Sequence, residues 1–289
     1  MRMAHVAIAC LLLVLFSGGR GAAADDALKP LKRKLIADGF AETQISALYP
    51  PGFTPLYKTV SQTLRLRESK LNYDQFLLPS AIDEARRFLR KNETTLLRAE
   101  ELYGVNRCVI VAILLVETHF GSYTGTIPTF AILSTFALMD QKGSRDRIWG
   151  LLSPQERKQW DRVEFDRRLV KRAEWAYEQL HALLKLTDCN PRRVAALRGS
   201  IMGAIGWPQF LPSSLVRWGI DGNGDGRIDL FQLEDAIFST ANYLREHGWD
   251  EAGAESRKEE VIYAYNHSRP YVGAILGVAR DLGDCQARK

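Results

Sequence analysis

The sequence predicts a mainly helical fold of two unequal lobes, and three observations support this prediction. Residues 108–116 form an unbroken apolar run, which is typical of a helix buried on all sides. Residues 164–186 repeat apolar side chains at helical spacing, and the inward stripe consists of Leu169, Ala173, Ala176, Leu180 and Leu184. No stretch alternates apolar and polar residues for long enough to predict a sheet, and the chain contains no internal repeat.

The composition is that of an ordinary globular protein that begins with an export signal. The 289 residues are 46% hydrophobic and 25% charged, enough for one large core or two lobes. Residues 1–24 combine Arg2, an apolar stretch and three alanines before Asp25, which is the layout of a secretory signal peptide. We expect cleavage after Ala24 rather than lipidation at Cys10, because too few apolar residues precede that cysteine.

The mature chain is mildly basic and contains three cysteines. Its 37 basic and 34 acidic residues leave a net charge of +3, which suits an anionic envelope polymer but is too small and too evenly spread to indicate nucleic acid. The apolar run at 108–116 is too short to cross a bilayer. Cys108 is interpreted as a small apolar side chain, and Cys189 and Cys285 could form a disulfide, although spacing alone does not establish one.

The remaining segments are assigned from turn and helix signals. Glycines and prolines divide residues 25–79 into short helices joined by turns. Ser80, with Asp83 three residues later, opens a helix that we expect to run to Tyr103. Residues 121–128 are rich in turn residues, residues 131–139 are apolar, and residues 230–248 are expected to form a helix.

Glu117 is the candidate catalytic residue because it is the one carboxylate at the end of the buried helix. Gly121 supplies a stop signal, so Glu117 falls in the last helical turn. Apolar neighbours and the negative end of the helix dipole both disfavour the charged carboxylate there. A carboxylic acid held protonated in this way could donate a proton in catalysis.

Two further segments have a composition suited to sugars, which present polar edges and apolar faces. Residues 199–214 combine small residues with Ser200, Gln209 and Trp207, although tight helix packing is the simpler reading. Residues 263–271 combine tyrosines with Asn266, and the alternative there is helix capping with core tyrosines. His119 and His267 are interpreted as surface or packing residues.

Residues 221–229 have the spacing of an EF-hand calcium loop. Oxygen donors stand at positions 1, 3, 5 and 9, which are Asp221, Asn223, Asp225 and Asp229. Position 6 is Gly226, and position 7 is Arg227, which would contribute its backbone carbonyl. Position 12 is Gln232 instead of glutamate, so Glu234 or Asp235 could supply the closing carboxylate. We expect a structural Ca²⁺ ion, with Na⁺ as the alternative, and no organic cofactor.

Taken together, these motifs resemble the membrane-bound lytic transglycosylase B family of peptidoglycan-cleaving enzymes, from about Tyr103 to about Tyr271. The matching segments keep the family's order and nearly its spacing: Val116-Glu117-Thr118-His119-Phe120-Gly121, Gly199-Ser200 with Gly203-Ala204 and Gly206, Gln209-Phe210 with Pro212-Ser213-Ser214, the calcium-type loop, Ala241-Asn242-Tyr243 with His247-Gly248-Trp249, and Tyr265-Asn266 with Ser268 and Tyr271. The family's paired arginines have only loose equivalents in Lys142, Arg145 and Arg147, and Trp207-Pro208 stands where Tyr-Gly is common.

The resemblance implies a lysozyme-like catalytic domain over residues 104–289 that includes an ion loop at 221–235, preceded by a helical segment, 25–103, packing on it. It assigns the catalytic acid and base to Glu117 and the last ion ligand to Asp235. Glycan contacts and the cleft wall are assigned to Ser200, Gln209, Tyr243, Tyr265, Asn266 and Tyr271.

The implied activity is cleavage of the MurNAc-GlcNAc β-1,4 bond of peptidoglycan with formation of 1,6-anhydroMurNAc, by a monomer in the periplasm without a lipid anchor. Glycoside cleavage usually uses two carboxylates, and only one stands near this motif, which favours assistance by the substrate's own N-acetyl group. The alternatives are a hydrolytic muramidase that uses the same Glu117 and a non-catalytic protein that binds peptidoglycan.

Overall fold

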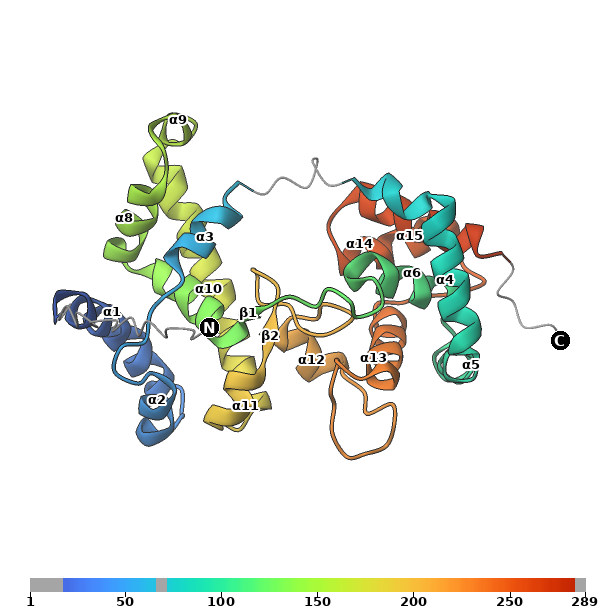
Figure 1. Ribbon diagram of the computed structural model, residues 1–289, viewed down its shortest axis with the longest axis horizontal. Coiled ribbons are helices and arrows are strands. Elements are labelled where there is room, and N and C mark those ends of the chain that lie inside the picture. The colour runs from blue at the N-terminus through green and yellow to red at the C-terminus, as the bar shows by residue number, and fades with distance from the viewer. Residues whose placement is uncertain (1–17, 66–71, 284–289) are drawn as a thin grey trace, which may run out of the picture.

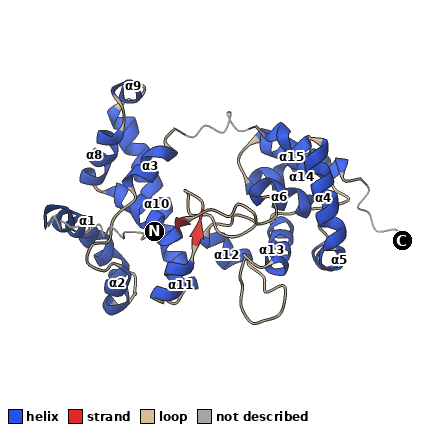
Figure 2. Ribbon diagram, in the orientation of Figure 1, coloured by secondary structure: helices blue, strands red, loops and turns tan. Residues whose placement is uncertain are grey.

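The computed structural model describes residues 18–65 and 72–283, with side chains from residue 27 onward. Helices dominate, and the described residues form a single two-stranded sheet (Figure 2), so the prediction of a mainly helical fold is confirmed. That sheet pairs β1 (Ile127–Pro128) with β2 (Arg198–Gly199) in antiparallel fashion, and Ile127 lies opposite Gly199. No helix in the described ranges is both long enough and apolar enough to cross a lipid bilayer.

Two separate hydrophobic cores divide the molecule into two lobes (Figure 1). We name the first the α10 lobe (residues 27–65 and 127–199), which contains α1 (Gly18–Ala37), α2 (Glu42–Leu48), α3 (Tyr57–Thr63), α7 (Thr129–Ala137), η3 (Leu138–Asp140), α8 (Lys142–Leu151), α9 (Pro154–Arg157), α10 (Arg162–Leu186) and α11 (Pro191–Ala196). The second, the α6 lobe (residues 72–126 and 200–283), contains η2 (Tyr73–Leu77), α4 (Pro79–Lys91), α5 (Glu93–Tyr103), α6 (Arg107–Thr118), α12 (Pro212–Trp218), α13 (Leu233–Glu246), α14 (Glu255–Tyr265) and α15 (Arg269–Asp281).

Neither lobe is built from one continuous piece of chain. The α6 lobe begins at η2, the chain returns to the α10 lobe through residues 119–128, and it comes back through residues 200–211. In the α6 lobe, α15 packs against α6 and η2, while α5 packs against α13 and α6. The expected boundary between residues 103 and 104 therefore falls inside one core, because α5 belongs to the same core as α6.

The two central helices follow the sequence pattern closely. All five residues of the predicted inward stripe of α10 are buried, and residues 108–115 of α6 are buried on every side. The helix expected from Ser80 to Tyr103 is instead two helices, α4 and α5, separated at Asn92. Asn92 leaves the helical conformation, and its side-chain amide donates to the carbonyl of Phe88 at 2.9 Å, a local bond that competes with helix continuation. The helix expected from residue 230 starts at Leu233.

The cysteines differ from what the sequence indicated. Cys108 is disulfide-bonded, and its partner lies outside the described residues, so the reading of this residue as a plain apolar side chain is wrong. Cys189 is a buried free thiol whose Sγ lies 3.8 Å from the carbonyl oxygen of Leu184. A Cys189–Cys285 disulfide is therefore not formed. Cys285 lies outside the described ranges, as do residues 1–17 of the signal segment expected over residues 1–24.

Candidate active site

The C-terminal end of α6 is fixed by an abrupt change of backbone conformation. Three successive residues, His119, Phe120 and Gly121, have positive φ angles of 46°, 55° and 82°. Helix α6 thus stops at Thr118, before the glycine that the sequence indicated as its end. A Cβ atom on Gly121 would lie 2.2 Å from the Trp207 ring, so this position has room only for glycine.

Thr118 ties the helix end to the other side of the site. Its hydroxyl donates to the carbonyl of Trp207 at 2.9 Å and accepts the N–H of Gly121 at 3.0 Å. Glu117, the preceding residue, therefore lies on a helical turn that hydrogen bonds to Trp207 and Gly121 hold in place. A reacting carboxylate needs such a fixed position.

Glu117 faces a cavity of about 310 Å³. Eight residues line it: Asn72, Tyr73, Gln75, Phe76, Val116, Glu117, Asn266 and Tyr271. Of these, Glu117 is the one acid, three are aromatic, three carry side-chain amides, and Val116 is aliphatic. The cavity therefore offers one proton-transfer group among the apolar faces and amides that suit a sugar ring.

Tyr271 is the principal partner of this carboxylate. Its hydroxyl donates to Oε1 of Glu117 at 2.7 Å, and its side chain is only 1% exposed. Burial, followed by the nearby negative charge of Glu117, raises the pKa of Tyr271 well above its usual value. Tyr271 thus remains a neutral hydroxyl that can donate a hydrogen bond throughout the physiological pH range.

Tyr265 and Asn266 complete the wall next to Tyr271. The Tyr265 ring stacks against Tyr271 with centroids 6.4 Å apart, and its hydroxyl donates to the carbonyl of Pro208 at 2.6 Å. Asn266 follows the last residue of α14 in an extended conformation, which turns the chain so that Asn266 lines the cavity. The structure therefore brings Glu117, Asn266 and Tyr271 together, with Tyr265 directly behind them.

Tyr243, by contrast, does not line this cavity. It is 7% exposed, its ring stacks on His247 with centroids 3.9 Å apart, and its hydroxyl donates to the carbonyl of Ala264 at 2.9 Å. Burial raises its pKa to about 12. Tyr243 lies behind Tyr265 at an edge-to-face centroid distance of 4.8 Å, so it supports the wall instead of facing a ligand.

Ser200 and Gln209 shape the connection between the lobes and are not among the residues that line the Glu117 cavity. The Ser200 hydroxyl oxygen accepts the N–H groups of Met202 and Ala204 at 3.2 and 3.1 Å. Gln209 has a φ of 51°, and its amide donates to the carbonyls of Thr124 and Gly206 at 3.2 and 2.8 Å. Both side chains thus organise the turns that adjoin the end of α6.

The sequence analysis did not identify the site residues in and next to η2. Four of them line the cavity although they precede Glu117 by more than forty positions, in a segment expected only to form short helices and turns: Asn72, Tyr73, Gln75 and Phe76. The one signal that could have found them is compositional, because Asn72-Tyr73 repeats the amide and aromatic pairing of Tyr265-Asn266.

The predicted ion loop lies between α12 and α13, a helix–loop–helix arrangement. The carboxylate of Asp221 accepts the N–H groups of Gly224, Asp225 and Gly226, and the buried carboxylate of Asp235 accepts those of Gly222 and Asp229. Asn223, Asp225 and Asp229 accept loop N–H groups in the same way, and Arg227 contributes its N–H to Asp225. An all-oxygen donor set fits a hard cation such as Ca²⁺. Within the described residues, however, no three acidic, histidine or cysteine side chains converge as a ready-made metal cluster.

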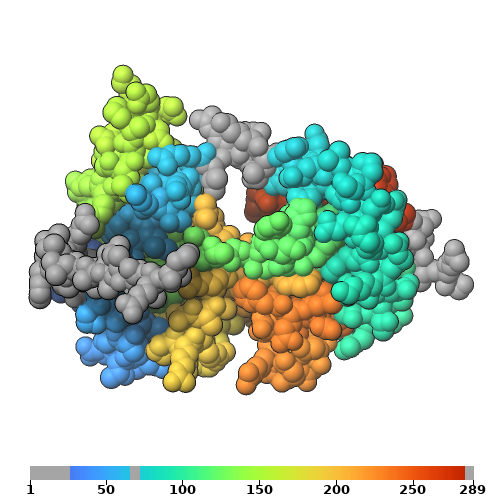
Figure 3. All heavy atoms as spheres, viewed as in Figure 1, coloured from blue at the N-terminus to red at the C-terminus, as the bar shows by residue number. Residues whose placement is uncertain are grey.

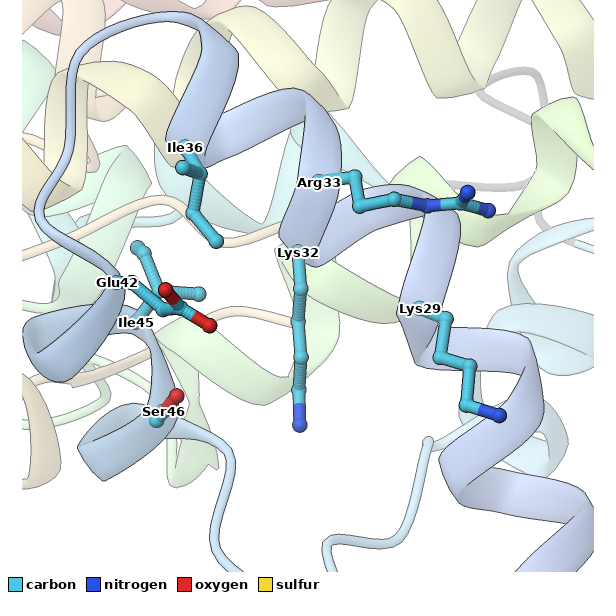
Figure 4. Close-up of a pocket in the computed structure, with 7 residues that line it drawn as sticks. All are labelled: Lys29, Lys32, Arg33, Ile36, Glu42, Ile45 and Ser46. Carbon is cyan, nitrogen blue, oxygen red and sulfur yellow. The ribbon is translucent and has the colours of Figure 1, made fainter.

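A second cavity, of about 320 Å³, lies in the α10 lobe between α1 and α2 (Figure 4). Figure 4 shows Lys32 extending into the space between the helices, with Lys29 and Arg33 on the same helix and Glu42 on the facing one. Glu42 is exposed, and this cavity contains no tyrosine or amide side chain. It therefore lacks the features that make the Glu117 cavity suitable for proton transfer to a sugar.

Comparisons with known proteins show which family the chain resembles. Residues 23–258 match the model of a protein family described as a transglycosylase SLT domain. Membrane-bound lytic murein transglycosylase B of Escherichia coli is 30% identical over 175 residues, which cover 61% of this chain and 40% of that relative. The chain thus matches well under half the length of that curated relative.

Solved structures with the same fold include two lytic transglycosylases. SLT35 of Escherichia coli, solved in complex with calcium, has a TM-score of 0.66 at 21% identity, with 92% of this chain and 94% of that chain covered. SltB3 of Pseudomonas aeruginosa, solved in complex with NAG-anhNAM-pentapeptide, has a TM-score of 0.70 at 19% identity, with 89% of this chain and 79% of that chain covered.

Proposed function

The chain belongs to the transglycosylase SLT domain family, and from this premise we propose that it is a lytic transglycosylase that cleaves the glycan strands of peptidoglycan. The observation that carries the proposal is the lone carboxylate of Glu117, held by Tyr271 in a cavity with no second acid among its lining residues. The names of the relatives support the substrate class, since one is a murein transglycosylase and another was solved with a muropeptide.

In the proposed reaction Glu117 acts first as an acid. Its proton passes to the glycosidic oxygen, the bond from that oxygen to C1 of N-acetylmuramic acid breaks, and the leaving sugar departs with a free hydroxyl. Positive charge then develops at C1, and the substrate's own N-acetyl oxygen stabilises it in place of the second carboxylate that other glycosidases supply. This step requires Glu117 to enter the reaction in its protonated form.

Glu117 then acts as the base. The 6-hydroxyl of the same sugar attacks C1, its proton passes to the Glu117 carboxylate, and a 1,6-anhydro ring closes. No water is consumed, and Glu117 returns to its starting protonation state. The hydrogen bond from Tyr271 stabilises the carboxylate in the interval between the two steps.

The remaining site residues take supporting roles in this proposal. Asn266 contacts the sugar at the cavity, Tyr265 and Tyr243 hold the wall, and Ser200 and Gln209 order the turns along which the strand continues. The loop containing Asp221, Asn223, Asp225, Arg227, Asp229 and Asp235 holds a calcium ion that stiffens the connection between α12 and α13, with sodium as the alternative. The related SLT35 was solved with calcium.

We propose a periplasmic location, a cleavable signal peptide and a monomer. The signal-like layout of residues 1–24 supports export, and the proposed substrate is found outside the cytoplasm.

Digestion of purified peptidoglycan, followed by mass measurement of the released fragments, tests the proposed function. Products that carry 1,6-anhydro sugars support it. Products heavier by one water molecule would instead identify a hydrolytic muramidase that uses the same carboxylate. Binding to peptidoglycan without any release of fragments would identify a non-catalytic envelope protein.

A further inference from the structure

Helices α6 and α15 run in opposite directions, and a contact at each end shows how they are aligned. At one end the hydroxyl of Tyr271, in the first turn of α15, donates to Glu117, in the last turn of α6, at 2.7 Å. At the other end Sγ of Cys108, in the first turn of α6, lies 3.9 Å from the carbonyl oxygen of Gly283, two residues after the end of α15. Glu117 and Cys108 are nine residues apart, which is about 13.5 Å along a helix. Because a helix is stiff along its axis, movement of α15 at the Cys108 end also moves the Tyr271 hydroxyl relative to the acid.

Cys108 is disulfide-bonded, and the chain leaves one candidate for its partner. The sequence contains three other cysteines, Cys10, Cys189 and Cys285. Cys189 is a free thiol, and Cys10 belongs to the segment that we expect to be removed on export. Cys285 stands two positions after Gly283, and two residues span at most about 7 Å, so it is within reach of the Cys108 sulfur.

Non-covalent contacts alone restrain this end of the helix pair weakly. A cavity of about 280 Å³ lies there, and its lining includes Asn106 and Val109 at the start of α6 and Leu276 and Ala279 of α15. Atoms that face a cavity lack packing partners on that side. A hydrogen bond from Arg86 to the carbonyl of the last α15 residue, at 2.7 Å, also reaches this end, but it is exposed to competing water. A covalent bond supplies the restraint that packing does not.

The end of α15 lies far from the space between the lobes. In Figure 1 the described chain ends on the outer side of the α6 lobe, opposite the α10 lobe. Figure 3 shows red atoms of the C-terminal helices both beside the hollow between the lobes and at that outer edge. A change at the outer edge therefore reaches Glu117 through α15 and not through the substrate.

We propose that Cys108 pairs with Cys285 and that this bond, the Cys108 latch, fixes α15 along α6 so that the Tyr271 hydroxyl stays on Glu117. The two cysteines are thus positioning residues that touch no substrate. When the bond forms, the two thiols pass two protons and two electrons to the disulfide of an oxidising exchange protein, which becomes a dithiol. Such oxidants act outside the cytoplasm, so the latch closes only after export. The catalytic consequence rests on the proposed function, whereas the covalent bond does not.

Peptide mapping tests the bond itself. The exported protein is alkylated without reduction, digested with a protease and analysed by mass spectrometry. We expect two peptides joined through Cys108 and Cys285, with Cys189 alkylated. An alkylated Cys108, or Cys108 joined to any other cysteine, overturns the pairing whatever the activity of the protein.

Kinetics test the positioning role. Cys285→Ser should lower kcat on peptidoglycan about 10-fold, the effect expected from losing the hydrogen bond of Tyr271 to a charged group. In the double variant with Tyr271→Phe, kcat should fall no further than in Tyr271→Phe alone, because both changes remove the same interaction. Dithiothreitol should lower the wild-type kcat equally and leave that of Cys285→Ser unchanged. All rates are measured well below the Tm of every variant, so that unfolding does not contribute.

The matched control is Cys189→Ser, which removes the free thiol of the α10 lobe. It should keep the wild-type kcat and lose it about 10-fold on reduction, as the wild type does. A disulfide that only stabilises the fold would lower the Tm of Cys285→Ser and leave kcat unchanged, and that result overturns the latch, as does an additive loss in the double variant. A wild-type protein that has the Cys108–Cys285 bond but releases no fragments refutes the proposed function and leaves the pairing in place.

Discussion

The two lobes are similar in secondary structure and opposite in charge. The α10 lobe has 20 basic and 11 acidic residues, whereas the α6 lobe has 13 basic and 19 acidic residues. All eight residues that line the Glu117 cavity belong to the α6 lobe. The formal net charge of +5 for the whole chain conceals this separation. The proposed proton transfer thus takes place in the lobe with the excess of acidic residues.

The difference in charge between the lobes indicates how a mildly charged protein can act on a substrate with neutral sugars and charged peptides. Positive charge close to Glu117 would favour its ionised form and weaken it as an acid. Placing the excess of basic residues in the other lobe allows attraction of carboxylates without that effect. If the separation is functional, changes in the two lobes should have separable effects on chemistry, on specificity and on stability.

The largest expected effect comes from removing the acid of the α6 lobe. Glu117→Gln keeps the shape and hydrogen bonding of the side chain but cannot exchange a proton. We expect the release of soluble muropeptides to fall about 10³-fold, within the range of general acid–base catalysis, with an unchanged thermal midpoint. Glu84→Gln, which changes a partly exposed acid of the same lobe, is the control and should retain activity. Retained activity in Glu117→Gln would remove Glu117 from the mechanism.

The next effect comes from the hydroxyl that holds this acid. Tyr271→Phe removes the 2.7 Å hydrogen bond to Glu117 and should lower kcat about 10-fold, because that bond is made to a charged group. Because the pKa of Tyr271 is raised well above its usual value, the hydroxyl stays protonated and the ratio of mutant to wild-type rates should be constant from about pH 5 to 9.

Rate profiles of both proteins across that range provide the check. A ratio that approaches one as the pH rises would show that Tyr271 ionises and would contradict the assignment. Tyr123→Phe, which changes a tyrosine that is 73% exposed, should match the wild type at every pH.

A smaller effect, on stability alone, is expected from the ion loop of the α6 lobe. Calcium at about 100 times its Kd should stabilise the folded protein by about 2.7 kcal/mol, seen as a rise of several degrees in Tm. Asp225→Ala should remove this rise while changing cleavage little, and a chelator should do the same to the wild type. Glu101→Ala, an exposed acid of α5, should leave the calcium response intact. A Tm that ignores both calcium and Asp225→Ala would exclude the proposed ion.

The smallest effect is expected from an exposed ion pair of the α10 lobe. Arg65 pairs with Glu156, and this contact lowers the pKa of Glu156 to about 2. A carboxyl whose pKa is lowered by folding contributes stability above its unfolded pKa and loses it as the pH falls toward 2. Glu156→Gln keeps the capping box with Ser153 and removes only the charge, so Tm at pH 7 should fall by about a degree.

Thermal unfolding of both proteins at pH 7 and near pH 2 measures this contribution, and the difference in Tm should disappear at the lower pH. A difference that persists near pH 2 would show that packing, and not the charge of Glu156, is responsible.

The sequence predicted the parts of the fold that depend on local patterns. The burial of α6 and the inward stripe of α10 follow from spacing along a single helix, and both are as expected. The break at Asn92 was missed because the amphipathic pattern continues through it, and only the geometry of one side-chain amide separates α4 from α5. Pairing of Cys108 could not be inferred because it depends on the distance between two segments.

The candidate site was predictable to a similar extent. Glu117, Asn266 and Tyr271 do meet at one cavity, but their roles in a reaction remain a prediction. Tyr243 was placed on the wall although it is buried behind it, because a tyrosine at a cavity and a tyrosine in a core look alike in a sequence. The contribution of η2 depends on how α15 packs against it, a long-range contact that no local pattern encodes.

The residues that form the Glu117 cavity lie far apart in the sequence, and this separation has a consequence for biosynthesis. Tyr271 and Glu117 are separated by 154 positions, and the helix that begins beside Tyr271 is the last one described. At a synthesis rate of about 5–20 residues per second, a growing polypeptide therefore carries its acid for about 8–30 seconds before the partner hydroxyl exists. A nascent or truncated polypeptide that stops short of residue 266 contains the reactive carboxylate without the Asn266 and Tyr271 side of its cavity. An enzyme proposed to cut the wall that protects its own cell thus completes its active site only after residue 271 has been made.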